Sequence, residues 1–225
     1  MFGSPARLIL TMAFMPLVLL FPARANEIEL FGRSEVAVEV KHRAPAHRRT
    51  YEFRPTLILI DDSGWTQKLL IDASTYSTEI LSQCGIGVPA INLITLKTSE
   101  KYKHPGRSQR VDLARSVFPA AKPLVFFIRS ASDVMNDAFS FGRSNTTSAE
   151  LKDTVWVKNA LTDIAGVALA HELVHILSNS GEHINEPNNL MNEDADTITV
   201  KLKPDQCNNI IKRGIENGFL NRKTN

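Results

Sequence analysis

Residues 162–178 read TDIAGVALAHELVHILS and form the most regular segment of the chain. Their large apolar residues recur at intervals of three and four, which predicts a helix with one apolar face. These residues are Leu169, Leu173, Ile176 and Leu177. His171 and His175 fall on a second face, one helical turn apart. Asn179 and Gly181 follow, and both residue types tolerate the left-handed backbone that ends helices. We therefore expect an amphipathic helix with a histidine face.

The two histidines have the spacing of a metal-chelating pair. Side chains four residues apart on a helix attach about 6 Å from each other, so both imidazoles can reach one Zn²⁺ at about 2.0–2.1 Å. Glu172 is rotated about 100° from His171, so its carboxylate can take a proton from water on the metal's open side. The pattern predicts His171 and His175 as ligands of one Zn²⁺ per chain and Glu172 as the general base. The alternative is a solvated helix that carries two surface histidines.

A third protein ligand is expected after the helix, because hydrolytic zinc sites generally use three. His183 is the favoured residue, since a turn at 179–181 can bring it back toward the helix. Glu182, Glu186 and Asp194 are the alternatives, because carboxylates also occur in catalytic zinc sites. Polar basic segments contain the remaining histidines, which we interpret as bystanders: His42, His47 and His104.

The sequence HELVH at 171–175, the later His183 and NNLMN at 188–192 together resemble the metzincin metallopeptidases. In that family a tight turn carrying a methionine lies beneath the metal. The resemblance implies that Met191 is the Met-turn residue, in addition to the three histidine ligands and the base Glu172. Without the upstream motif, Met191 would be interpreted as a gap-filling core residue.

The sequence departs from the family pattern directly after the helix. His183 follows the second histidine at a longer spacing than the family uses, and Ser178 stands at the position of the family's glycine. Asn179 or Gly181 must therefore make the turn. No tyrosine follows Met191 closely, so the extra transition-state donor of some family members has no candidate there.

Apolar patterns elsewhere predict strands interleaved with helices. Strands are expected at 27–30, 35–40, 56–60, 90–96, 124–129, 138–141 and 154–157, and helices at 65–84, 111–118 and 204–217. The expected class is α/β (α+β): a twisted mixed sheet with an antiparallel edge strand, two long helices including the zinc-binding one, and a small C-terminal lobe with the Met-turn and a terminal helix. In the metzincins the edge strand, here 138–141, pairs with the substrate backbone.

The first 25 residues are typical of a secretory signal. Arg7 precedes an apolar run at 8–21, and small residues surround a cleavage point after Ala25. An uncleaved anchor is the weaker alternative, because this run has about 14 residues and a membrane span needs roughly 20. We expect a signal peptide at 1–25 and a secreted or periplasmic domain at 26–225, with an upper lobe at about 26–181 and a lower lobe at about 182–225.

The charge balance gives no sign of a polyanionic partner. The formal charge of +2 includes Arg7 and Arg24 in the signal, so the remaining chain is formally neutral. We therefore expect no nucleic-acid partner, and no membrane partner after signal cleavage. The basic run at 41–49 contains Pro45, which is typical of an exposed connection between strands.

Two cysteines, Cys84 and Cys207, are present, and an exported protein is in the right compartment to join them. Each lies on the apolar face of an expected helix, so a disulfide between Cys84 and Cys207 is predicted, with two buried free thiols as the alternative.

Together these patterns predict a secreted zinc-dependent endopeptidase that acts on a peptide or protein substrate. One alternative is a non-catalytic binding or inhibitory module of the same fold, in which zinc is structural. Another is a zinc hydrolase that attacks cell-wall amides by the same chemistry.

Overall fold

The computed structural model describes residues 27–37, 50–130, 142–144, 149–160, 162–192 and 200–223. The expected signal peptide, the basic run at 41–49 and the expected strand at 138–141 lie outside these residues, as do His42, His47 and Asp194. The described strands are β1 (Ile28–Ala37), β2 (Tyr51–Phe53), β3 (Thr56–Ile60), β4 (Ile86–Gly87), β5 (Ala90–Thr98), β6 (Leu124–Ile128), β7 (Gly142–Ser144), β8 (Thr154–Lys158) and β9 (Leu220–Arg222). The described α-helices are α1 (Gln67–Leu81), α2 (Arg107–Ser116), α3 (Thr162–Ser178) and α4 (Pro204–Glu216), with short 3₁₀ turns at Ser82–Cys84 and Glu100–Tyr102.

The expected α+β class is confirmed, with a six-stranded mixed sheet in the order β1-β5-β3-β6-β8-β7. The four central strands are parallel, and both edge strands, β1 and β7, pair antiparallel with their neighbours. The antiparallel edge strand on the β8 side therefore lies at Gly142–Ser144, directly after the segment where the sequence predicted it. Strand β6 is buried at every position, as expected for a parallel strand covered on both faces.

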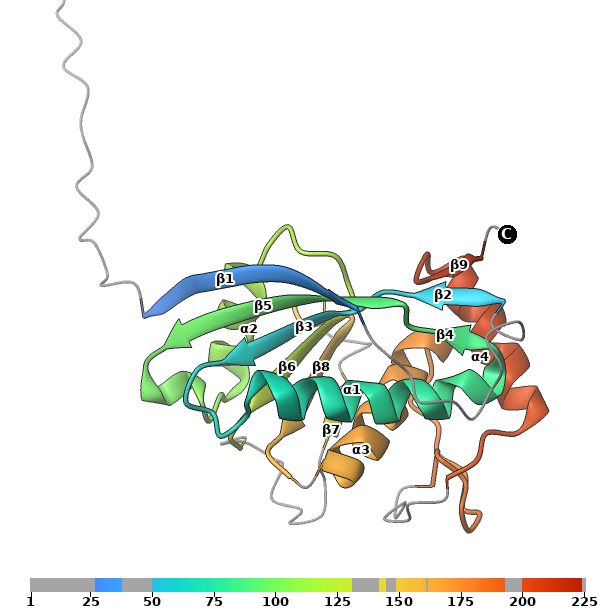
Figure 1. Cartoon of the computed structure of the whole chain (residues 1–225). Coiled ribbons are helices and arrows are strands. Elements are labelled where there is room, and N and C mark those ends of the chain that lie inside the picture. The colour runs from blue at the N-terminus through green and yellow to red at the C-terminus, as the bar shows by residue number, and fades with distance from the viewer. Residues whose placement is uncertain are drawn as a thin grey trace, which may run out of the picture.

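Helices cover both faces of this sheet. Helices α1 and α3 lie along the same side of the sheet (Figure 1) and share one large core cluster with residues of β3, β6 and β8. Leu113 and Val117, from α2 and its end, belong to a second cluster, on the opposite face. The alternation along β6 explains the two clusters, because Val125 and Phe127 enter the first and Phe126 enters the second.

Strand β1 is one strand where the sequence predicted two, because a bulge interrupts its pattern. The register with β5 shifts between Leu30 and Gly32, so Phe31 is an extra residue. As a result Ile28 packs on the cluster under α2, whereas Val36 packs on the cluster under α1 and α3. The apolar alternation changes phase at the bulge, so the sequence pattern predicted a break between two strands.

Gly166 sets the close approach of α3 to α1. A Cβ atom at this position would lie 2.7 Å from Cβ of Tyr76 and 3.0 Å from the carbonyl oxygen of Ala73. A backbone oxygen cannot move away as a flexible side chain can, so an added methyl group would push the helices apart.

We expect Gly166→Ala to lower the free energy of unfolding by about 1–3 kcal/mol, the usual cost of overpacking a core. Alanine favours a helix by only about 1 kcal/mol over glycine, which does not offset the clash. Gly32→Ala is the matched control, because a Cβ there has no atom within 4 Å. Urea unfolding of both variants measures the difference, and a G166A variant as stable as the wild type would contradict this account.

A second, three-stranded sheet in the order β4-β2-β9 joins the C-terminal end of the chain to the rest. Close to it, Cys84 and Cys207 are joined by a disulfide that links the end of α1 to the first turn of α4. A cross-link between residues 123 apart stabilises a fold by up to about 5 kcal/mol in the chain-entropy model. Within the described ranges, no helix has the length and apolarity to cross a bilayer.

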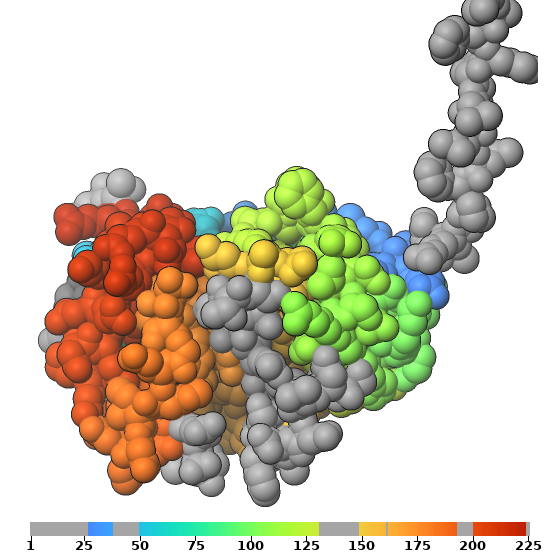
Figure 2. Space-filling view, turned by 180° about the vertical axis from the view of Figure 1, so that it is seen from behind, coloured from blue at the N-terminus to red at the C-terminus, as the bar shows by residue number. Residues whose placement is uncertain are grey.

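The segments after α3 gather at one end of the molecule. In the back view of Figure 2 the orange and red residues that follow α3 and form α4 lie at the end opposite the green region of α2. The connection from 179 to 192 leaves α3 and returns to it, because the carbonyl of Leu190 accepts from Nδ1 of His171 on α3 at 2.7 Å. This return places the end of α3 and the connection after it next to each other.

Candidate metal centre

Helix α3 has the predicted bounds and carries the two histidines on its last turns. The four large apolar residues of its predicted stripe are all buried, together with His175, which is 5% exposed. Asn179 ends the helix with a positive φ of 49°, as predicted for one of the two candidate turn residues. The amide of Ser180 then donates to the carbonyl of His175 at 3.1 Å, which starts the return of the chain.

His171, His175 and His183 converge on one point. Their Nε2 atoms are 3.0 Å apart between His171 and His175, 3.1 Å between His171 and His183, and 3.2 Å between His175 and His183. Ligand nitrogens around a tetrahedral zinc with bonds of about 2.0–2.1 Å stand about 3.3 Å apart. The three side chains together form a group that could hold a metal ion.

Backbone carbonyls determine which nitrogen of each helical histidine faces this point. Nδ1 of His171 lies 2.7 Å from the carbonyl oxygen of Leu190, and Nδ1 of His175 lies 2.7 Å from that of Ser180. A carbonyl oxygen can only accept, so each Nδ1 carries the hydrogen and donates it. In the neutral rings both Nε2 atoms then present lone pairs, and two lone pairs 3.0 Å apart repel each other unless a cation lies between them. This arrangement fits the chemistry of a metal-binding donor set.

The pKa values of these rings favour the neutral, metal-binding form. Burial, and next the neighbouring His175, lower the pKa of His171 to about 4. Burial likewise lowers the pKa of His175 below its ordinary value. Neutral imidazole is the form that binds a metal, so these two side chains could bind one at neutral pH without losing a proton.

The third histidine comes from the loop, as the sequence predicted. His183 is exposed, yet the bond from the following amide, Ile184, to the carbonyl of Met191 holds its backbone beside the turn. Of the alternative ligands, Glu186 pairs with Lys203, and neither it nor Glu182 belongs to the converging group. The described bystander His104 is also outside this group and is hydrogen-bonded to Ser130.

Glu172 and Met191 are both buried residues next to members of the histidine cluster, Glu172 along the chain and Met191 in the turn that contacts His171. Glu172 lies three residues before His175 on α3 and is only 9% exposed. Met191 is 4% exposed and packs in the large core cluster, in the turn whose Leu190 carbonyl binds His171. The methionine therefore belongs to the core and to the turn beside the histidines at the same time.

The carbonyls of Ser180 and Leu190 are parts of this site that sequence reasoning missed. Any residue type supplies a carbonyl oxygen, so the sequence carries no signal for these two contacts. The side chain of Asn189 accepts a hydrogen bond from the amide of Met191 within the turn. The sequence contained a weak signal for this contact, because the repeated asparagines of NNLMN are typical of turns held by side-chain hydrogen bonds.

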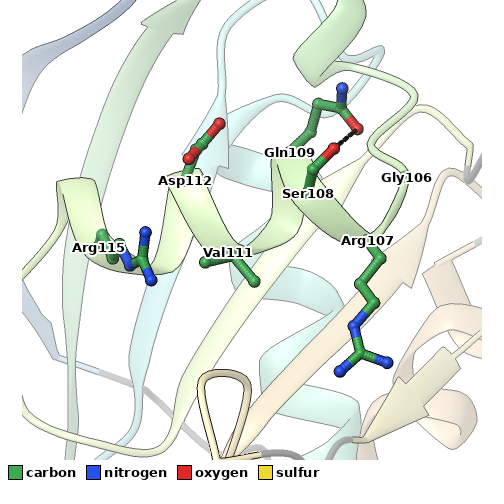
Figure 3. Close-up of a pocket in the computed structure, with 7 residues that line it drawn as sticks. All are labelled: Gly106, Arg107, Ser108, Gln109, Val111, Asp112 and Arg115. Carbon is green, nitrogen blue, oxygen red and sulfur yellow. Dashed lines mark hydrogen bonds between the residues drawn. The ribbon is translucent and has the colours of Figure 1, made fainter.

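An open pocket of about 620 Å³ lies along α2 and is a different feature from the metal centre. Figure 3 shows that its lining comes from α2 and the residue before it, with Arg107 and Arg115 near the two ends of the helix. None of the three converging histidines lines it. Because α2 covers the face of the sheet opposite α3, this pocket does not extend the histidine cluster.

The fold is similar to that of metalloproteinase-II from Bacteroides fragilis, with a TM-score of 0.51 and 14% sequence identity. The match covers 80% of this chain and 57% of that one, so the chain spans less than two thirds of its length. A chain in the structure of a chaperone-substrate complex matches with a TM-score of 0.48 and 9% identity, over 77% of this chain and 36% of that one. No family model matches the sequence, and no curated protein gives a significant match. At these identities the likeness establishes the fold alone.

Proposed function

We propose that this chain is an exported zinc-dependent endopeptidase of the metzincin type. The convergence of three histidine Nε2 atoms within 3.2 Å of one another carries the proposal. The described metal-binding group contains three protein side chains, which is the number in catalytic zinc sites, whereas structural sites use four. The similarity in fold to a protein named metalloproteinase-II adds support.

His171, His175 and His183 would hold the metal. When bound, zinc lowers the pKa of its water from about 15.7 to about 7 and polarises the carbonyl of the scissile bond. Leu190 and Ser180 hold the helical rings in the tautomer with a free Nε2 lone pair, so these ligands are preorganised.

Glu172 is the proposed general base. It follows the first proposed ligand, His171, on α3, and the residue is 9% exposed. The carboxylate would accept a proton from the attacking water and later deliver it to the leaving amine.

Two further features fit the proposed metzincin type, and the second also favours a peptide substrate. Met191, in the turn that holds His171, would be the Met-turn residue. Strand β7 is an antiparallel edge strand that contacts α3, so a peptide added along it would pass the proposed catalytic helix. Main-chain pairing of this kind gives affinity without strong side-chain selectivity.

Export is the part of the proposal that concerns localisation. The disulfide between Cys84 and Cys207 is typical of an oxidising compartment, and the sequence at 1–25 has the pattern of a cleaved signal peptide. The proposed catalytic domain at 26–225 has an upper lobe ending near 181 and a lower lobe at about 182–225.

Metal analysis and digestion of casein test this function directly. We expect the purified protein to contain about one zinc per chain, to cleave casein, and to lose this activity with a chelator. Added zinc should restore cleavage. Full activity in a protein freed of metal would contradict the proposal, and a zinc-containing protein that cleaves neither casein nor a peptide library would favour a non-catalytic binding module.

A further inference from the structure

A pair of side-chain amides joins the turn beside the metal centre to helix α4. Nδ2 of Asn189 donates to Oε1 of Gln206 at 3.2 Å, and Nε2 of Gln206 donates to Oδ1 of Asn189 at 3.1 Å. Asn189 is 4% exposed and Gln206 is half-buried, so the reciprocal pair is partly shielded from water. Breaking the pair would leave polar atoms of the buried Asn189 side chain without this partner, which costs free energy.

Each amide of this pair also binds the backbone. Oδ1 of Asn189 accepts from the amide of Met191 at 2.9 Å, and Oε1 of Gln206 accepts from the amide of Lys203 at 2.7 Å. Lys203 is the N-cap residue of α4. The pair therefore fixes the shape of the turn at 188–192 and attaches that turn to the start of a helix.

The start of helix α4 is held in place by contacts with the end of α1. Cys207, next to Gln206 in the chain, is covalently joined to Cys84. Beside Cys84, the amide of Gln83 accepts from the backbone of Leu202 and donates to the carbonyl of Val200, both at 3.1 Å. The segment before α4 and its first turn are thus fixed to the end of α1.

The same turn supplies two of the backbone contacts of the histidine cluster. The carbonyl of Leu190 accepts from Nδ1 of His171 at 2.7 Å, and the carbonyl of Met191 accepts from the amide of Ile184, which follows His183. Leu190 and Met191 are the two residues after Asn189, and the Met191 amide is the group that Asn189 binds. The orientation of Asn189 is therefore transmitted to one ligand ring and to the backbone of another ligand.

We propose that Asn189 and Gln206 are positioning residues of the metal centre. They act through the turn at 188–192, which orients His171 and places His183. The inference rests on the proposed function only in requiring that the three histidines bind a metal. Outer partners of metal ligands contribute about 10- to 100-fold to metal affinity, and this pair acts one step further out.

Zinc affinity of the full chain, measured by competition with a chromophoric chelator, tests the proposal. We expect Asn189→Ala and Gln206→Ala each to weaken zinc binding about 10-fold. The double variant should lose little more than either single variant, because both substitutions break one pair. Asn208→Ala, at an exposed asparagine of α4, is the matched control and should bind zinc as the wild type does.

The comparison separates positioning from general stability. Circular dichroism establishes that each variant is folded at the temperature of the titration, and thermal unfolding of the metal-free protein measures the structural cost. A folded N189A variant with wild-type zinc affinity would overturn the proposal, whatever its melting temperature. If N189A does not fold, wild-type affinity in Q206A overturns it equally. A wild-type chain that binds no zinc would instead show that the proposed function itself is wrong.

Discussion

Replacement of Glu172 by glutamine is expected to reduce peptide hydrolysis by about 10²- to 10⁴-fold, the usual contribution of a general base. Glutamine has nearly the same shape, so the side chain still fills its buried place on α3. It has no basic carboxylate and cannot take the proton from water. Because Glu172 is outside the group of three converging histidines, the variant should keep about one zinc per chain.

The control for this result is Glu182→Gln. Glu182 is an exposed carboxylate in the connection after α3 and was an alternative metal ligand, so its replacement also tests that role. We expect unchanged cleavage of casein and unchanged zinc content in E182Q. Wild-type turnover in E172Q would refute the assignment of the base, and a loss of zinc there would show that Glu172 contributes to binding.

The bounds of helix α3 could be predicted to the residue because all of its determinants are local. Its apolar spacing, its histidine pair and its stop at Asn179 all lie between 162 and 181, and the observed helix is Thr162–Ser178. The buried strands β3 and β6 were predicted for a similar reason, since continuous β-branched and aromatic residues favour strands covered on both faces.

Features that depend on distant partners were not predicted. The small sheet of β2, β4 and β9 joins short segments from both ends of the chain, and none has a strong pattern by itself. Helix α2 begins at Arg107, four residues before its predicted start, because its first turn contains no apolar residue that would mark it in the sequence. The two buried apolar residues Leu113 and Val117 lie within the predicted range 111–118.

The candidate site likewise contains residues that the sequence could indicate and groups that it could not. His171, His175 and His183 could be proposed from side-chain chemistry and spacing, since imidazole is a common zinc ligand. The groups that orient them, such as the carbonyl of Leu190 and the amide of Gln206, could not be located without the fold. A contact across 19 residues of chain leaves no local pattern.

Replacement of His183 by alanine is expected to weaken zinc binding by at least about 100-fold, more than loss of an outer partner costs. His183 is the proposed ligand that the sequence placed with least constraint, because the connection from α3 is longer than the spacing in metzincins. It is also the exposed member of the cluster, so its removal should leave the core intact. Chelator competition measures the affinity, and casein cleavage should fall with zinc occupancy.

Two further variants determine whether coordination, and not the loop, explains this loss. His183→Glu supplies a carboxylate ligand of the kind found in some catalytic zinc sites, so its zinc affinity should lie between those of H183A and the wild type. His104→Ala removes a histidine outside the cluster and should change neither affinity nor cleavage. Wild-type zinc affinity in H183A would exclude His183 as the third ligand. The third position would then belong to a residue such as Glu182, Glu186 or Asp194, and substitution of each in the H183A background would identify it.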